Sequence, residues 1–268
     1  MIGMHNMTFF LGGYDLEMMT IRDLLAEHAI GRFCDKNLSW GAKASAYREE
    51  IEKSLLERRT PVLIELEYDL NLSDEEVIIV DHHGREAGVD KPTSLHQVFE
   101  LLRLPTEKWM WWFELVAAND RGYIPALLEM GATKEEIIKV RSADRAAQGI
   151  TPEEEVEGEK AVARFESVAG GMLTVVRLQH TRTAAVTDRM ERDLGGPGYE
   201  NLLVISPAEV NFFDTGTIIL ALNDAFPRGW YGGSLPERGF WGHSESVKEA
   251  LPFLIDFCNC SGTLPLKR

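Results

Sequence analysis

The sequence predicts an α/β protein of two domains, a larger one built on a parallel sheet and a smaller mixed α/β one at the C-terminal end. Short apolar runs alternate along the chain with amphipathic segments, which is typical of parallel strands joined by crossover helices. A highly charged stretch at residues 133–168 separates two regions with this pattern. We therefore expect domains at 1–168 and 169–268, the first of which ends in a charged helical linker from about residue 133.

In the first domain, apolar runs bounded by glycine or charged residues indicate strands, and amphipathic segments indicate helices. Thr93 or Ser94 is a plausible helix cap, and the sequence AANDRG at 117–122 predicts a break in an aromatic-rich helical stretch. The expected elements are a strand at 7–13, a helix at about 17–30, a helix at 45–59, strands at 61–70 and 76–80, a helix at 93–104 and the helical stretch at 106–130.

The charged stretch is expected to be helical with a break at 149–152, after which the strand and helix pattern begins again. Whether residues 211–220 form an edge strand that joins two copies into a homodimer stays open. The expected elements of the second domain are strands at 172–178, 201–206 and 217–222, a helix at 183–194, a turn at 195–198 and a last helix at 246–257.

Composition restricts the partners and the location of the protein. The 268 residues are 44% hydrophobic and carry a formal net charge of −15 at pH 7. This acidic balance repels polyanions and disfavours long duplex nucleic acid, whereas a small phosphorylated ligand held by metals remains compatible. No segment has the apolar length of a membrane span, and the N-terminus lacks a signal-like apolar core. We expect a soluble, cytoplasmic protein without a membrane partner.

Polar side chains follow the predicted strands of the first domain at the points where the strands end. Because the carboxyl ends of parallel strands meet at one edge of a sheet, we expect these side chains to converge. Carboxylates together with imidazoles suit divalent manganese, magnesium or iron, which can activate a water for attack on phosphorus. The residues are Asp15 and Glu17, Glu65 and Glu67, then Asp81, His82 and His83, and finally Asp120 in the helical break.

The segment VIIVDHHG, residues 77–84, resembles the motif that gives the DHH phosphoesterases their name, in its context of a strand followed by glycine. This superfamily includes RecJ-type exonucleases, nano-RNA and cyclic-dinucleotide phosphodiesterases and manganese-dependent inorganic pyrophosphatases. The resemblance implies that His82 is a metal ligand, that Asp81 orients or ligates, and that His83 contacts the scissile phosphate. It also implies that Asp120 is a late aspartate ligand and that the cofactor is Mn²⁺, with Mg²⁺ as the alternative.

Two acidic motifs of the family have altered counterparts here. The first is a histidine, three residues, an aspartate, one residue and an aspartate; this chain has Asp15 and Glu17, but Leu11 stands at the histidine position. The second offers a metal-bridging aspartate, for which Glu65 is the best match and Glu67 the next. The resemblance therefore implies a degenerate first metal motif beside a better preserved second site.

The C-terminal region resembles the DHHA1 accessory domain, whose glycine-rich, histidine-containing loop binds substrate. The resemblance implies that residues 230–246 form this loop. Its glycines would let main-chain amides approach an anion, and a following helix would add a favourable dipole. The substrate-binding residues that the resemblance implies are Gly232, Gly233, Arg238, Gly242 and His243.

The sequence therefore favours a metal-dependent phosphoesterase that hydrolyses a phosphodiester or phosphoanhydride bond in a small substrate, such as a short oligonucleotide or a dinucleotide. The alternative is a catalytically degenerate protein that binds a nucleotide or phosphate ligand, for which Leu11 is the main argument. A pyrophosphatase is less attractive, because that branch has a different C-terminal domain.

Each motif also has a simpler interpretation. The Asp-His-His run could be a capped turn with surface histidines, and Asp15 could be an ordinary helix N-cap with Glu17 in the first turn. Glu65 and Glu67 alternate with a leucine, so both could lie on the solvent side of an edge strand.

Overall fold

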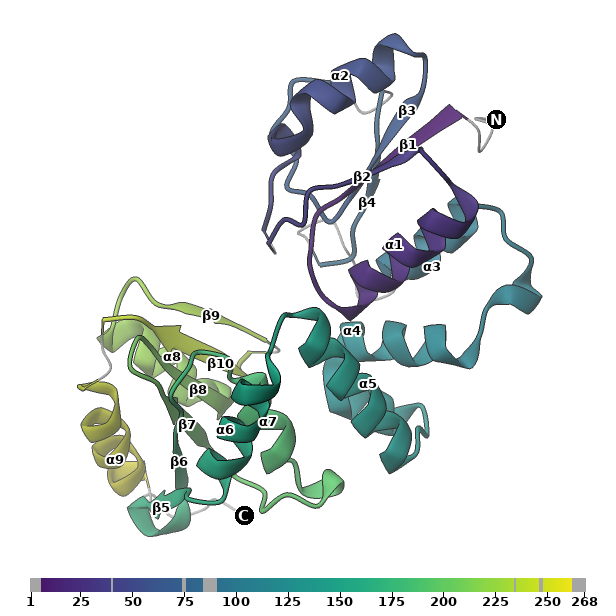
Figure 1. The fold of residues 1–268 in the computed structure, drawn as a ribbon. Coiled ribbons are helices and arrows are strands. Elements are labelled where there is room, and N and C mark those ends of the chain that lie inside the picture. Colours follow the sequence, from purple (N-terminus) through teal and green to yellow (C-terminus); the bar gives the residue numbers. More distant parts are fainter. Residues whose placement is uncertain are drawn as a thin grey trace. The chain divides into compact units, whose positions relative to one another are not determined.

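The chain folds into two compact units, Met1–Gly149 and Ile150–Arg268, each built on its own sheet. The structure is a computed structural model that describes residues 6–39, 41–73, 76–83, 91–233, 235–245 and 248–261. Within these described residues, the first sheet has four strands and the second has six, with helices packed on them (Figure 1). The predicted fold class, two α/β domains, is confirmed.

The units divide earlier than the expected boundary at 168/169. The reason is that helix α6 (Pro152–Val162) packs on α7 (Ala184–Met190), and strand β5 (Glu166–Val168) pairs with β6 (Leu173–Arg177), so both elements belong to the second unit. The expected break at 149–152 separates α5 (Lys134–Ala147) from α6.

The first sheet is parallel, with the strand order β2-β1-β3-β4. In the register of the sheet, Leu11 is aligned with Ile64, and Ile64 with Val80. Three strands therefore end at the same level of one edge, which places the residues that follow them side by side. The strands are β1 (Met7–Leu11), β2 (Phe33–Asp35), β3 (Thr60–Ile64) and β4 (Ile78–Val80).

Helices cover both faces of this sheet. Helix α2 lies on one face, with α1 and α3 on the other (Figure 1). The core beneath α2 joins Phe10 and Leu63 of the sheet to Tyr47 and Ile51. The helices of this unit are α1 (Leu16–His28), α2 (Arg48–Leu56), α3 (Ser94–Leu101), α4 (Trp111–Glu129) and α5.

Helix α4 contains the break that the sequence predicted, at the C-terminal end of the expected interval. Gly122 and Tyr123 have non-helical backbone angles, and Tyr123 has φ of 52°. Asp120 therefore lies in the last regular turn before the break, not in a loop. Among the described residues, none of the helices combines the length and apolar character needed to cross a bilayer.

The second sheet is mixed, with the order β5-β6-β7-β8-β10-β9. Strands β6 and β7 run parallel, and the other neighbours run antiparallel. The elements that complete this unit are β7 (Leu202–Ile205), β8 (Val210–Thr215), β9 (Trp230–Gly232), β10 (Arg238–His243), α8 (Gly216–Ala225) and α9 (Ala250–Ser261).

The prediction of a strand at 217–222 was wrong, because this segment is the start of α8. Ile218, Ile219 and Leu222 are buried in the core beneath the helix, whereas Leu220 is exposed, which is a helical spacing. Strand β8 pairs with β7 and with β10, so residues 211–220 do not form an edge strand.

Two further expectations about strands also differ from the structure. The predicted strand at 61–70 ends at Ile64, because Glu65 adopts a φ of 50°, which is outside the extended region. Residues 230–246, expected to be a loop, instead contain the hairpin of β9 and β10. Strands β2 and β5 were not predicted from the sequence.

Candidate metal centre

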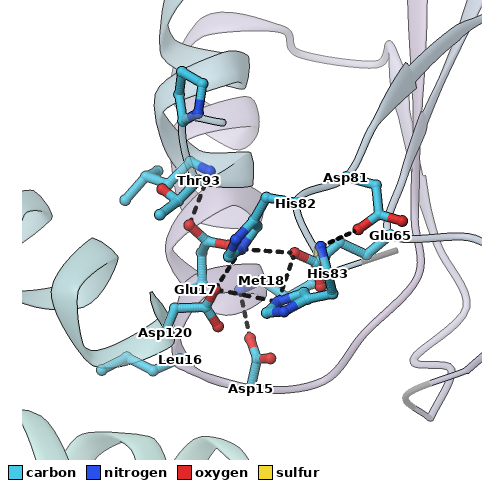
Figure 2. A network of polar contacts seen from close by, with 12 residues as sticks. Asp15, Leu16, Glu17, Met18, Glu65, Asp81, His82, His83, Thr93 and Asp120 are labelled. Carbon is cyan, nitrogen blue, oxygen red and sulfur yellow. Dashed lines mark hydrogen bonds and ion pairs between the residues drawn. The ribbon is translucent and has the colours of Figure 1, made fainter. Parts of the chain in front are cut away.

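Five of the expected side chains converge at the carboxyl edge of the first sheet (Figure 2), namely Glu17, Glu65, His82, His83 and Asp120. Glu65 follows β3 directly, and its N–H donates to the carbonyl of Val80 at 2.8 Å. Its positive φ turns the chain out of the strand at this point, a strained conformation of the kind that functional sites retain. Gly12 permits the loop after β1 to approach, because a Cβ there would lie 2.1 Å from the Glu65 carbonyl oxygen.

His82 and His83 point their Nε2 atoms toward the same carboxylates (Figure 2). His82 Nε2 lies 2.5 Å from Asp120 Oδ2 and 3.4 Å from Glu17 Oε2. His83 Nε2 lies 3.2 Å from Asp120 Oδ2 and 3.6 Å from Glu65 Oε1. Residues from α1, the ends of β3 and β4, and α4 thus converge on one point.

Glu65, His82, His83 and Asp120 each offer one ligand atom, and these atoms lie within 4.8 Å of one another. Four buried atoms at the centre, Glu65 Oε1, His82 Nε2, Asp120 Oδ2 and Glu17 Oε2, have no hydrogen-bond partner among the described residues. The short His82–Asp120 approach is at ion-pair distance but lacks hydrogen-bond direction. Buried polar groups are normally satisfied, so four such atoms facing each other fit a bound divalent cation.

The carboxylates of the centre repel one another. Burial, with the nearby charge of Asp120, raises the pKa of Asp15 to about 7, although the main-chain N–H of Met18 lowers it. Burial and the charges of Glu17 and Asp120 raise the pKa of Glu65 well above its ordinary value. A dication would relieve this repulsion by favouring the ionised carboxylates.

The histidines supply positive charge when no metal is bound. Burial lowers the pKa of His82, but contacts with Asp120 and Glu17 outweigh it and bring the pKa to about 10. Burial alone would raise the pKa of Asp120, yet the two histidines hold it at about 2. Contact with Asp120 also raises the pKa of His83. Metal binding would therefore exchange protons on imidazole for a cation.

Two of the predicted residues also hold the local backbone. Asp15 Oδ1 accepts from the N–H of Met18 at 2.8 Å and is the N-cap of α1, as its simpler interpretation proposed. Asp81 Oδ1 accepts from the N–H of His83 at 2.8 Å. Asp81 lies outside the four-residue ligand group, and its carboxylate contacts the main chain of His83.

The first motif contributes no nitrogen ligand at Leu11. Its side chain is buried at the end of β1, and its carbonyl accepts from the hydroxyl of Tyr47 at 2.7 Å. Of the two acids considered for the second motif, the structure brings Glu65 into the cluster. Glu67 is exposed and lies 3.4 Å from Lys43.

A buried polar network beside the centre was missed at the level of sequence. Arg141 of α5 donates to Asn119 Oδ1 at 2.8 Å and to Asp144 Oδ2 at 2.9 Å, and Asp144 Oδ1 accepts from the N–H of Leu16 at 3.3 Å. The guanidinium of Arg141 also lies 5.1 Å from the ring of Tyr123 at the break in α4. The network ties the neighbour of Asp120 to the neighbour of Glu17. Its only sequence signal is the helical spacing of Arg141 and Asp144 within a stretch that looked solvent-exposed.

The five residues expected to bind substrate all lie on the β9–β10 hairpin of the second unit or beside it. Strand β10 has a paired strand on each side, so the main-chain amide of Gly242 faces a neighbouring strand and is not open to an anion. His243 is buried; its Nδ1 accepts from the N–H of Glu245 at 2.9 Å, and its Nε2 lies 3.2 Å from the carbonyl of Pro227. Gly233 follows β9 with φ of 107°, and Arg238 contacts Asp214 at 3.1 Å.

No family model matches the sequence, and no curated protein matches it. Among solved structures, the chain is similar to RecJ from Thermus thermophilus in complex with Mn²⁺, with 12% identity and a TM-score of 0.46. That match covers 96% of this chain and 52% of RecJ, so the chain spans about half the length of that protein.

Two other solved structures are similar over most of the chain. One is an exopolyphosphatase-related protein from Bacteroides fragilis, with 11% identity and a TM-score of 0.47. The match covers 96% of this chain and 92% of that protein. The other is a DHH domain described as belonging to a family of ribosomal proteins, with 16% identity and a TM-score of 0.41. The match covers 97% of this chain and 76% of that domain's chain. The last of these is described as a DHH domain, and residues 77–84 of this chain resemble the motif of that name. At these identities the similarity is one of fold.

Proposed function

We propose that this protein of the DHH phosphoesterase type hydrolyses a phosphodiester or phosphoanhydride bond in a small substrate with the help of a divalent metal, Mn²⁺ or Mg²⁺. The observation that carries the proposal is the set of four buried atoms that converge where the Asp-His-His run follows β4 and that have no hydrogen-bond partner among the described residues. Buried carboxylate and imidazole atoms that lack hydrogen-bond partners and lie close together are the kind of donor set that a hydrolytic metal site uses.

In this proposal, Glu65, His82 and Asp120 hold the cation, and Glu17 supports them from α1. The cation supplies Lewis acidity for the phosphoryl group and lowers the pKa of a water molecule. The side chain of His83 is 32% exposed, whereas that of His82 is 7% exposed, so His83 is the imidazole that an incoming substrate meets. His83 would donate to a non-bridging phosphoryl oxygen, while Asp81 holds its backbone in place.

The small size of the substrate follows from charge. A net charge of −15 opposes the approach of a long polyanion, whereas a dinucleotide or short oligonucleotide places few phosphates near the protein. Mn²⁺ as the physiological ion is part of the same proposal, supported by the mixed carboxylate and imidazole ligands.

A second candidate is a protein that binds a nucleotide or phosphate without hydrolysis. It is favoured by Leu11, which offers no ligand, and by Glu17, one of whose oxygens accepts from the N–H of Leu95 at 3.0 Å. A centre that holds a single ion could bind phosphate without activating a water in the correct place.

The test is Mn²⁺-dependent hydrolysis, with a chelator as control, of bis(p-nitrophenyl) phosphate, a dinucleotide, cyclic dinucleotides and pyrophosphate, alongside a count of bound metal. We expect turnover that His82→Ala abolishes and that His28→Ala, a histidine in the last turn of α1 outside the cluster, retains. Nucleotide affinity without turnover in the metal-loaded protein would overturn hydrolysis in favour of the second candidate. Full metal binding by His82→Ala would overturn the assignment of the centre.

A further inference from the structure

The second unit contains a polar cavity at one end of its sheet, with a volume of about 690 Å³. The cavity lies where β8 ends in Asp214 and Thr215 and where β10 begins. His243 stands at the opposite end of β10, five residues from its start, or about 17 Å away. The cavity is therefore separate from the histidine end of the hairpin, and its volume is in the range of sites that bind small molecules.

Four hydroxyl groups line this cavity, those of Ser167, Thr174, Tyr199 and Thr215. Thr174 of β6 is 6% exposed, and Ser167 of β5 is its paired residue, so the two share one face of the sheet. Within the described parts of the chain, none of the four side chains has a hydrogen-bond partner. Buried hydroxyls in proteins are normally hydrogen-bonded, so these groups are available to a polar ligand.

Arg192 supplies a cation to the cavity wall from the short 3₁₀ helix η5 (Arg192–Leu194). Its side chain makes neither a hydrogen bond nor an ion pair with any residue that the structure describes. The guanidinium packs on the turn at 195–198, because a Cβ on Gly198 would lie 2.4 Å from Arg192 Nε. The main-chain N–H groups of this turn donate to the carbonyls of residues 190–192. The guanidinium, and not the backbone of the turn, is thus the group open to an anion.

The remaining polar lining is mainly acidic. Asp214 has φ of 113°, a strained conformation of the kind that functional sites retain, and it contacts Arg238 at 3.1 Å. This contact neutralises Arg238, so Arg192 is the cation left for a ligand. Glu200 and Glu237 add two carboxylates that can accept from hydroxyl groups. One free guanidinium among hydroxyls and carboxylates suits a ligand that has a single anionic group and several hydroxyls.

We propose that this cavity binds a phosphorylated sugar, either free or as the sugar phosphate of a nucleoside monophosphate. The guanidinium of Arg192 pairs with the phosphate through charge-assisted hydrogen bonds. The four hydroxyls and the carboxylates of Glu200 and Glu237 bond to the hydroxyls of the sugar. The surrounding acids oppose a second phosphate. The site goes beyond the proposed function, because its residues belong to the second unit and the metal centre belongs to the first.

The test is calorimetric titration of the full chain with ribose 5-phosphate, AMP, ribose and inorganic phosphate, in the presence of a chelator that keeps the metal centre empty. We expect ribose 5-phosphate to bind at least roughly ten-fold more tightly than ribose or inorganic phosphate. Arg192→Gln should weaken its binding roughly ten-fold, and Tyr199→Phe, which keeps the ring, roughly five-fold. Arg182→Gln is the matched control, since Arg182 is exposed outside the cavity and the change in net charge is the same.

Unchanged affinity in Arg192→Gln, or an equal loss in Arg182→Gln, would overturn the site. So would the failure of both ribose 5-phosphate and AMP to bind at millimolar concentration. Equal affinity for inorganic phosphate and ribose 5-phosphate would overturn the sugar as the ligand. Tighter binding of AMP than of ribose 5-phosphate would support the site with a nucleotide as its occupant, and the reverse order would support it with a free sugar phosphate. Circular dichroism checks that the variants fold.

Two results separate this site from the metal centre. His82→Ala should bind ribose 5-phosphate as tightly as the unmodified chain, and a loss of binding would place the ligand at the metal centre and overturn the cavity. If the chain hydrolyses a substrate with Mn²⁺ but binds no sugar phosphate under chelator, the cavity fails and the metal centre stands. If it binds ribose 5-phosphate through Arg192 but neither binds Mn²⁺ nor hydrolyses any substrate, the phosphoesterase proposal fails and the cavity stands.

Discussion

Glu17 Oε1 accepts a hydrogen bond from the main-chain N–H of Leu95 at 3.0 Å, which joins the first turn of α1 to the first turn of α3. The other oxygen of the same carboxylate lies 3.4 Å from His82 Nε2. One buried side chain therefore fixes two helices beneath the centre and contributes to the centre itself.

The two roles of Glu17 are separable by substitution. Glu17→Gln keeps an acceptor for the Leu95 N–H but removes the charge that faces His82, so we expect weaker Mn²⁺ binding with a free energy of unfolding within about 1 kcal/mol of the unmodified chain. Glu17→Ala should lose metal affinity and also about 1–3 kcal/mol of stability, because it leaves a buried N–H unsatisfied. Urea denaturation and Mn²⁺ titration measure the two effects; equal stability of both variants would contradict the capping role.

Glu65 and Glu67 offer a matched pair on one short segment. Glu65→Gln should abolish or strongly weaken Mn²⁺ binding and raise the thermal midpoint of the metal-free protein, because it removes a buried carboxylate whose pKa is already raised by burial and by Glu17. Glu67→Gln should change stability by less than about 1 kcal/mol, since its contact with Lys43 is a surface ion pair. Calorimetry with and without Mn²⁺ checks both. Loss of metal binding by Glu67→Gln instead would reverse the assignment.

The stability of the metal-free protein should fall as pH rises above about 4. The pKa of Asp15 is about 7 in the folded chain against an ordinary value of 3.8, so between these values the unfolded chain ionises first and folding loses stability. The pKa of His82 is about 10 against 6.5, so the stability from its charged form is complete below 6.5 and is lost as pH rises through 10. Urea denaturation in the presence of a chelator across this pH range measures the trend, and a stability that rises with pH would contradict it.

Metal binding should show the opposite dependence on pH, because the ligands must be deprotonated. We expect the rise in thermal midpoint on adding Mn²⁺ to be larger at pH of about 8 than at about 5. Melting curves with Mn²⁺ and with chelator across this range supply the measurement. A rise that shrinks with increasing pH would mean that the carboxylates and histidines of the cluster do not hold the ion.

Arg141 should position Asp120 without touching the ion. Arg141→Met leaves Asp144 buried without its main countercharge, and we expect a loss of about 3–5 kcal/mol of stability together with weaker Mn²⁺ binding. The double variant Arg141→Met with Asp144→Asn, which removes the buried charge, should recover part of the stability but not the metal affinity. If it recovers both equally, the network serves stability alone.

The sequence by itself determined that the candidate ligands would meet. The apolar run followed by Asp81, His82 and His83 predicts a strand of a parallel sheet, and the carboxyl ends of parallel strands meet at one edge. Glu65 lies inside the strand expected at 61–70, and only the structure ends β3 at Ile64. The fold class and the break in α4 were predictable for the same reason, since both depend on local apolar periodicity and on glycine.

Only the tertiary structure decided between Glu65 and Glu67, because the choice depends on the positive φ at which the chain leaves β3. It also decided that residues 217–222 are helical, since β-branched residues at this spacing fit a strand until the core beneath α8 is known. Long-range packing buries Arg141 and places the indole of Trp230 against Gly242. No local sequence pattern encodes which distant surface will cover a side chain.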